Sequence, residues 1–208
     1  MKGLFITFEG LDGSGKSTQI KKLCDYLAGK GSDALLTREP GGCPVSERIR
    51  EIILNRGNPM DAVTEALLYA AARAEHVKEV IRPALEAGKT VISDRYVDSS
   101  IAYQGYGRGL GYEKVMQING HAIDGLWPDI TFYLKIPLDM VLKRITAPLD
   151  RLESEGKKFF SHVMQGYDEI AKKSSGRIIC IDGTMDIDAV FSKIVERVQL
   201  LIARQEGK

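Results

Sequence analysis

A glycine-rich segment between Gly10 and Ser17 carries the residue types that bind nucleotide phosphates. It has the form G-x-x-x-x-G-K-[ST], with Lys16 and Ser17 at its end. Glycines let backbone N–H groups curl around phosphate oxygens, the lysine reaches the β- and γ-phosphates, and the serine hydroxyl binds Mg²⁺. The segment therefore predicts a site for a nucleoside triphosphate with Mg²⁺, made by Gly10, Leu11, Asp12, Gly13, Ser14, Gly15, Lys16, Ser17 and Thr18.

The alternative for this segment is a glycine-rich turn that precedes a surface lysine. Its context argues for the phosphate loop, because it follows the apolar stretch Leu4–Phe8 and opens a helical pattern whose dipole points at the same anion. The guanine-reading N-K-x-D signature is absent, and the chain is small for a motor. A nucleotide kinase needs an acceptor site and a closing lid, and both have candidates downstream.

A second set of polar residues, Asp94-Arg95-Tyr96, directly follows the apolar stretch Thr90–Ser93. Open α/β sheets bind their ligands at the carboxyl ends of the strands. Asp94 can help to hold Mg²⁺ through water or accept a hydrogen bond from Arg95. The Arg95 guanidinium can bind an acceptor phosphate through two parallel hydrogen bonds. The alternative for the pair is a surface ion pair.

Five short apolar stretches alternate with longer segments of helical periodicity. We expect these stretches to be strands: Leu4–Phe8, Ala34–Thr37, Thr90–Ser93, Ile130–Ile136 and Ile178–Ile181. The alternation predicts an α/β fold with a five-stranded parallel sheet and helices on both faces, forming a single domain over residues 1–208. Residues 145–158 mix proline, glycine and charge, and we expect them to form a short lid insertion.

Two further segments carry structural expectations. Apolar residues spaced by three or four predict one buried face of a long helix, formed by Val63, Leu67, Ala70, Ala74, Val77 and Ile81. Pro83 and Gly88 are expected to mark its end. The segment Gly105–Gly111 fails the G-x-G-x-x-G pattern of dinucleotide sites in every register, so we expect a flexible loop beside the acceptor site.

The composition excludes several classes of protein. With 29 basic and 28 acidic residues, the net charge is +1, which does not favour nucleic acid as a partner. No apolar run approaches the length of a membrane span, so no membrane partner is expected. The three cysteines lie far apart without a C-x-x-C pair, which indicates a reducing, cytoplasmic environment. The three histidines lack metal-ligand spacing.

Taken together, the polar motifs resemble those of the thymidylate kinase family. The matching segments, in order and spacing, are Phe8–Asp12, Thr37–Gly42, Asp94–Tyr96, Ser99–Ser100 and Ala102–Gly105. The resemblance runs from about Leu4 to the C-terminal helix. It implies a P-loop nucleotide kinase fold that transfers phosphate from ATP to dTMP with Mg²⁺ as cofactor. It also implies a homodimer joined by helices, for which the apolar face of the long helix is one candidate and intramolecular core is the other use of that face.

The resemblance also implies a dTMP site. Tyr69 stacks on the base, the Arg73 guanidinium donates to a thymine carbonyl, and Tyr103 excludes a ribose 2′-hydroxyl. Arg95 holds the acceptor phosphate, and Arg50 can reach it. The remaining members of the site are Asp12 near the 3′-hydroxyl, Glu39 and Pro40 along the pocket wall, and Ser100 and Gln104 at the base edge. Without the resemblance, Tyr69 and Arg73 would be a half-buried tyrosine beside a solvated arginine.

Phosphoryl transfer needs a further cation near the transferred group. Gly13 occupies the position where some thymidylate kinases carry an arginine in the phosphate loop, so the resemblance is to the bacterial branch with this arginine in the lid. The segment 150–153 resembles the lid motif D-R-x-E, and Arg151 is the expected catalytic residue. Arg144 is expected to contact adenine or the donor phosphates. Residues near Gly183 and Thr184 are expected beside adenine, by analogy of fold.

Three alternatives to a dTMP kinase stay open at this point. The first two are a kinase for another nucleoside monophosphate and a kinase for a deoxynucleoside. The third is an ATP-binding module without catalysis. A nucleoside kinase needs an acid to take a hydroxyl proton, whereas Arg50 and Arg95 favour an acceptor that already carries a phosphate. Lys16, Ser17 and Asp94 argue against a bare binding module.

Overall fold

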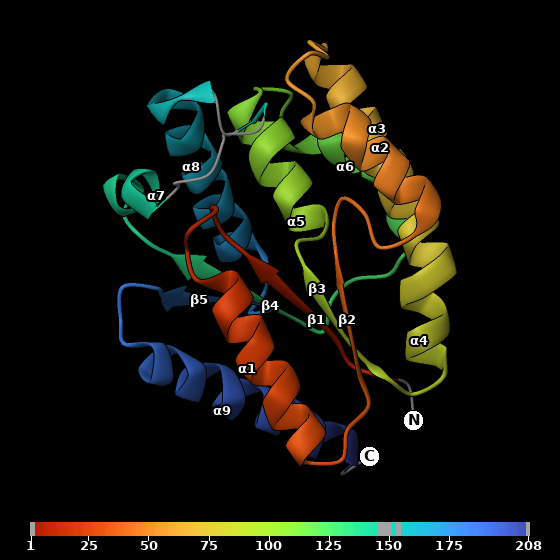
Figure 1. The fold of residues 1–208 in the computed structure, drawn as a ribbon, viewed down its shortest axis with the longest axis vertical. Helices are drawn as coiled ribbons and strands as arrows, with labels where there is room; N and C mark the ends of the chain where they lie inside the picture. Colours follow the sequence, from red (N-terminus) through yellow and green to blue (C-terminus); the bar gives the residue numbers. More distant parts are fainter. Residues whose placement is uncertain (1–2, 145–150, 153–154, 207–208) are drawn as a thin grey trace.

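A computed structural model describes residues 3–144, 151–152 and 155–206 of the chain (Figure 1). The expected lid segment therefore falls largely on residues 145–150 and 153–154, which lie outside the described residues. The described strands form one parallel sheet in the order β2-β3-β1-β4-β5. Their bounds are Phe5–Glu9 for β1, Ala34–Arg38 for β2, Thr90–Asp94 for β3, Ile130–Lys135 for β4 and Ile178–Asp182 for β5.

The five expected strands are confirmed. Four of them end one residue later than predicted, β1 also begins one residue later, and β4 ends one residue earlier. All five end on a polar residue, because backbone pairing in the sheet does not require an apolar side chain. Arg38 pairs with Asp94, and Lys135 pairs with Asp182. Since all strands are parallel, these polar ends gather at one edge of the sheet, which is where the candidate site lies.

Helices cover both faces of this sheet. The α-helices are α1 (Lys16–Gly29), α2 (Pro44–Leu54), α3 (Ala62–His76), α4 (Arg82–Glu86), α5 (Val97–Ser100), α6 (Tyr112–Ile123), α7 (Leu138–Arg144), α8 (Lys157–Lys173) and α9 (Ile187–Glu206). Two π-helical segments, η1 (Val77–Ile81) and η2 (Ile101–Gly107), continue α3 and α5. Figure 1 shows α1 and α9 side by side along one face, and α2 beside α3 above the other end of the sheet.

The core follows the alternation of side chains along the strands. Ile6 and Phe8 of β1 pack with apolar residues of α1 and α9, whereas Phe5 packs on the opposite face with residues of η1 and α4. A third apolar cluster joins η2 to α8 and includes Tyr103, Phe159 and Tyr167. Strands that are buried on both faces read as continuous apolar runs, which is why the sequence revealed them clearly.

The predicted buried face of the long helix is partly wrong. Leu67 is 53% exposed and Ala74 is also exposed, whereas Glu65, Arg73 and His76 are buried. The helix turns a polar face inward because these three side chains find hydrogen-bond partners there. Helical residues continue to Glu86, so Gly88 marks the end as expected, but Pro83 lies in the first turn of α4, where a missing N–H is tolerated.

The prediction of a flexible loop over Gly105–Gly111 is also wrong for its first part. Gly105 and Gly107 belong to η2. A Cβ atom at Gly107 would lie 2.7 Å from a ring carbon of Phe159, so glycine allows α8 to approach η2 closely. Wider π-helical turns often occur at functional sites, and η2 carries Tyr103 and Gln104.

Candidate active site

The phosphate loop connects β1 to α1 and surrounds the side chain of Lys16. Lys16 Nζ donates to Gly10 O at 3.0 Å and Leu11 O at 3.1 Å, and lies 3.5 Å from Asp12 Oδ1. Burial and the nearby Arg95 guanidinium lower the pKa of Lys16. Gly13 and Gly15 adopt φ angles of 77° and 98°, which favour glycine and turn the loop around the lysine.

A cavity beside this loop brings together most of the residues predicted to bind ATP. Its lining includes Asp12 and all residues from Gly13 to Thr18, together with Asp94 and Arg144. Arg144 Nη1 donates to Gly13 O at 3.0 Å. Gly183 lines the same cavity along with the apolar side chains of Met185, Ile187 and Val190, which suits the flat face of a base. Thr184 instead donates its hydroxyl to Asp182 Oδ1 at 2.6 Å.

Ser17 and Asp94 fit the expected Mg²⁺ site. Both line the cavity, and Asp94 Oδ1 is buried without a hydrogen-bond partner among the described residues. An unpaired buried carboxylate oxygen is costly unless a cation or water meets it. Mg²⁺ favours oxygen ligands and is commonly held by few protein groups together with substrate phosphates. The donors present here therefore suit this ion.

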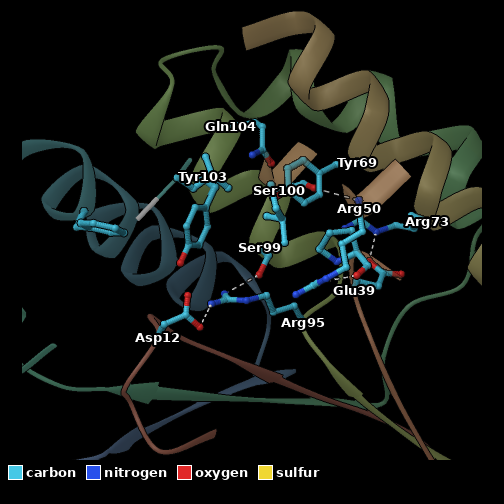
Figure 2. Close-up of a pocket in the computed structure, with 14 residues that line it drawn as sticks. Asp12, Glu39, Arg50, Tyr69, Arg73, Arg95, Ser99, Ser100, Tyr103 and Gln104 are labelled. Carbon is cyan, nitrogen blue, oxygen red and sulfur yellow. Dashed lines mark hydrogen bonds and ion pairs between the residues drawn. The ribbon is translucent and has the colours of Figure 1, made fainter. Parts of the chain in front are cut away.

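A second cavity adjoins the first and contains the residues predicted to bind dTMP (Figure 2). All ten of them line it, although they come from the phosphate loop, the β2–α2 connection, α2, α3, the β3–α5 connection, α5 and η2. Asp12 lines both cavities, so the two sites share a wall. The sequence motifs omitted three lining side chains: Leu54, Leu152 and Phe160. These are apolar residues without a spacing that would set them apart from core.

Arg95 sits where the two cavities meet. Its Nη2 donates to Asp12 Oδ1 at 2.9 Å, its Nη1 donates to Ser99 Oγ at 3.3 Å, and its guanidinium lies 5.2 Å from the centre of the Tyr103 ring. Burial alone would raise the pKa of Asp12, but Arg95 and Lys16 lower it below its usual range. Arg95 also has a φ of 73°, a left-handed conformation unusual for a non-glycine residue and found at functional sites.

A buried carboxylate that the sequence reasoning assigned no role lies behind Arg95. Glu9 Oε2 accepts from Ser99 Oγ at 2.5 Å and from Tyr167 Oη at 2.7 Å, and its Oε1 accepts from the Tyr96 backbone N–H at 2.8 Å. Burial and the nearby Asp98 carboxylate raise the pKa of Glu9 to about 7. Ser99 and Tyr167 both also contact Arg95 Nη1, so Glu9 supports the two hydroxyls on which Arg95 rests.

Arg73 is held at the far wall of the second cavity. Its side chain is 2% exposed, and its Nε donates to Glu39 Oε2 at 2.7 Å. Its remaining nitrogens donate to Ser100 Oγ at 3.0 Å, to the Tyr96 carbonyl at 3.1 Å and to Asn119 Oδ1. Because Ser100 accepts from Arg73, its own hydroxyl hydrogen is left to donate into the cavity.

A second layer of side chains, which no sequence motif indicated, holds the Glu39 carboxylate in place. Glu39 Oε1 lies 3.1 Å from His76 Nδ1, and His76 Nε2 lies 2.7 Å from Thr37 Oγ1. His76 and Asn119 belong to no recognised motif. His76 follows Arg73 by three residues on the same helix, which is the one signal that could have indicated that they share a face.

The two lid arginines are placed differently from each other. Arg151 Nη1 forms an ion pair with Glu65 Oε2 at 2.7 Å, and its Nε donates to Ile53 O at 2.8 Å. Arg151 itself does not line the second cavity, although the next residue, Leu152, does, whereas Arg144 contacts the phosphate loop. Lys157 and Lys158 are exposed in the first turn of α8.

Comparisons with known proteins agree with this arrangement. The family model described as Thymidylate kinase matches residues 8–194. A thymidylate kinase of Geobacillus sp. (strain WCH70) is 50% identical over 203 residues, covering 95% of this chain and 97% of that protein. One from Geobacillus thermodenitrificans (strain NG80-2) is 48% identical over 212 residues, covering 100% of this chain and 93% of that protein. The crystal structure of thymidylate kinase from Ehrlichia chaffeensis has a TM-score of 0.79 and 37% identity, covering 96% of this chain and 99% of that chain. The chain therefore belongs to the thymidylate kinase family.

Proposed function

We propose that this protein transfers the γ-phosphoryl group of ATP to dTMP, giving ADP and dTDP. The observation that carries this proposal is the second cavity, in which all ten residues expected around dTMP line one space. That space shares Asp12 with the cavity of the phosphate loop, so an acceptor phosphate there lies next to the donor site. Such positioning supplies much of the catalysis in phosphoryl transfer.

The acceptor binds through its phosphate and its base. We assign the 5′-phosphate to Arg95 and Arg50, of which Arg50 Nη1 donates to Pro40 O at 2.8 Å and lines the cavity. Figure 2 shows Tyr69, Ser100 and Gln104 grouped at the other end of the cavity, where the base would stack on Tyr69. Arg73 and the Ser100 hydroxyl offer donors to a thymine carbonyl.

The sugar lies between these two ends. Asp12 and Tyr103 both line the cavity. We assign to Asp12 the hydrogen bond from the deoxyribose 3′-hydroxyl, and to the Tyr103 ring the exclusion of a ribose 2′-hydroxyl. Pro40, which follows a cis peptide bond after Glu39, forms part of the wall. A site shaped this way selects deoxyribonucleotides by excluding the larger sugar.

The donor side neutralises charge on the transferred phosphoryl group. Lys16 lies in the phosphate loop, and Ser17 with Asp94 would hold Mg²⁺, which supplies further positive charge to the phosphates when bound. The 5′-phosphate of dTMP is ionised at neutral pH, so the reaction needs no strong base. We propose that residues 145–158 act as a lid and that Arg151, within this segment, is the catalytic arginine. Arg144, which contacts the phosphate loop, would bind the donor phosphates.

One experiment tests the activity directly. ADP release is measured with Mg-ATP and, in parallel, dTMP, dUMP, dCMP, dGMP, AMP and thymidine as acceptors. We expect strong preference for dTMP. Turnover with a different monophosphate would overturn the substrate but not the kinase mechanism, and absence of turnover with every acceptor would favour an ATP-binding module.

We also propose a homodimer in the cytoplasm, the compartment that holds both nucleotide substrates and keeps thiols reduced. Its interface would be the outer face of α2 and α3, where Val45, Ile52 and Leu67 are 48%, 46% and 53% exposed. These helices pack side by side (Figure 1), and we propose that their three exposed apolar side chains form one dimer surface. Light scattering coupled to gel filtration should give twice the chain mass, and Leu67→Glu should give the monomer mass.

All three cysteines are free thiols. No helix in the described part of the chain has the length and apolar character to cross a bilayer.

A further inference from the structure

Glu65 is a fully buried carboxylate on α3 that touches the acceptor cavity only through a neighbour. Its exposed fraction is 0%, and it pairs with three side chains, two from η2 and the residue that follows it and one from position 151. Gln104 Nε2 donates to Glu65 Oε1 at 2.8 Å. The guanidinium groups of Arg108 and Arg151 lie 3.0 and 2.7 Å from Glu65 Oε2. Glu65 itself does not line the cavity, whereas Gln104 does.

The partners of Glu65 determine which way the Gln104 amide faces. A glutamine amide has one donor end and one acceptor end, and a carboxylate only accepts hydrogen bonds. The Gln104 nitrogen must therefore lie on the Glu65 side, because the reversed amide would place its carbonyl oxygen against a carboxylate. No hydrogen bond to Gln104 Oε1 occurs among the described residues, so the acceptor end remains for a ligand. In Figure 2 the Gln104 side chain reaches toward the space beside Tyr69 and Ser100.

An acceptor at this point discriminates between pyrimidines. Thymine and uracil carry a hydrogen on N3 and can donate to a carbonyl oxygen. Cytosine has an unprotonated N3, which would meet the Gln104 oxygen as one acceptor against another. A site built to hydrogen-bond one partner rejects an analogue that leaves its polar group unpaired.

We propose that Glu65 is a positioning residue that fixes the Gln104 amide with its oxygen toward the base and thereby selects thymine and uracil over cytosine. This inference rests on the proposed function, since it concerns the base of the acceptor nucleotide. Glu65 would thereby control which base is bound without contacting the base itself. Arg108 and Arg151 flank the carboxylate with positive charge, which keeps it an acceptor.

The test is the ratio of kcat/KM for dTMP to kcat/KM for dCMP in the wild-type protein and in Glu65→Gln. An amide at position 65 can donate as well as accept, so Gln104 can turn over and donate its amide N–H to the unprotonated N3 of cytosine. We expect the ratio to fall at least about tenfold, which is the scale of one misplaced base contact. A purely structural role would lower both kcat/KM values together and leave the ratio unchanged, and that result would overturn the proposal.

The matched control is Glu155→Gln, which removes a carboxylate 2.6 Å from Arg108 Nη1 that forms no hydrogen bond with Gln104 among the described residues. It should leave the ratio unchanged, and an equal fall in this control would contradict the assignment to Glu65. A double-mutant cycle with Gln104→Leu adds a second criterion, because Glu65→Gln should then have no further effect on the ratio. If Glu65→Gln fails to fold, Glu65→Asp keeps the charge between the arginines while drawing it away from Gln104, and should lower the ratio by a smaller factor. A wild-type protein that does not prefer dTMP to dCMP would instead refute the proposed function.

Discussion

The raised pKa of Glu9 predicts how stability depends on pH. Burial and the Asp98 carboxylate raise this pKa from an ordinary 4.5 to about 7. In the folded protein the group therefore holds its proton at pH values where the unfolded chain has released it. Stability linked to Glu9 is complete below the unfolded pKa and is lost as the pH rises through the folded one. A pKa raised by this much corresponds to about 3 kcal/mol, most of which is lost between about pH 5 and about pH 8.

Glu9→Gln removes the titration while keeping a side chain that can hydrogen-bond Ser99, Tyr167 and the Tyr96 N–H. The unfolding free energy of the variant, minus that of the wild type, should therefore rise by about 2–3 kcal/mol from about pH 5 to about pH 8. Urea denaturation at several pH values measures this difference. Other titrating groups cancel in the difference, apart from those that interact with Glu9, namely Asp98, Arg95, Tyr167, Lys16, Tyr103 and Arg177.

The matched control for this experiment is Glu169→Gln, which replaces an exposed carboxylate whose pKa is lowered by the hydrogen bond from Lys172. A lowered pKa contributes stability that is lost only as the pH falls below the ordinary range. Its difference from the wild type should therefore be flat between about pH 5 and about pH 8. A flat profile for Glu9→Gln as well would refute the reasoning, because it would mean that Glu9 ionises in the fold as easily as in the unfolded chain.

Three further changes test the proposed roles in the site. Arg151→Ala should lower kcat by orders of magnitude with dTMP affinity nearly unchanged, as for a contact made mainly in the transition state, and loss of dTMP affinity at normal kcat would contradict that role. Arg144→Ala should mainly raise KM for ATP, as measured by ADP release, because this side chain contacts Gly13 in the phosphate loop; an effect confined to dTMP would be inconsistent with it. Asn119→Ala should destabilise the fold by about 1–3 kcal/mol and raise KM for dTMP, since it removes an acceptor from buried Arg73, and unchanged thermal unfolding would argue against that contact.

The parts of the site that the sequence revealed are those in which function depends on neighbours along the chain. The phosphate loop needs its glycines, Lys16 and Ser17 at fixed spacing, so their types alone indicated their use. Asp94 and Arg95 were found for the same reason, since a strand end places both at the ligand edge of the sheet. The apolar strands were equally clear, because burial on both faces leaves few polar residues in them.

The parts that the sequence did not reveal depend on contacts between distant segments. Glu9 and Tyr167 are 158 positions apart and meet only in the folded protein. On α3, the spacing of the apolar residues predicts that they face the core, and Glu65 and Arg73, which lie outside this pattern, would then face solvent. The structure shows that these polar side chains face inward while Leu67 faces outward. Hydrophobic periodicity assumes that polar residues prefer water, and this assumption fails where a binding site lies under a helix.

In the acceptor cavity, carboxylates of the protein hold three of the side chains that would meet the nucleotide, whereas Arg50 is held by the Pro40 carbonyl. Asp12 holds Arg95, Glu39 holds Arg73, and Glu65 holds Gln104. Each pairing fixes a side chain before the ligand arrives, which reduces the ordering cost of binding. The same pairing couples binding to stability, because loss of one partner leaves the other buried and uncompensated. For the Glu39–Arg73 ion pair, whose side chains are 4% and 2% exposed, truncating either side chain should therefore destabilise the fold as well as weaken dTMP binding. For Asp12, whose side chain is 48% exposed, water can replace the lost partner, and the effect should fall mainly on binding.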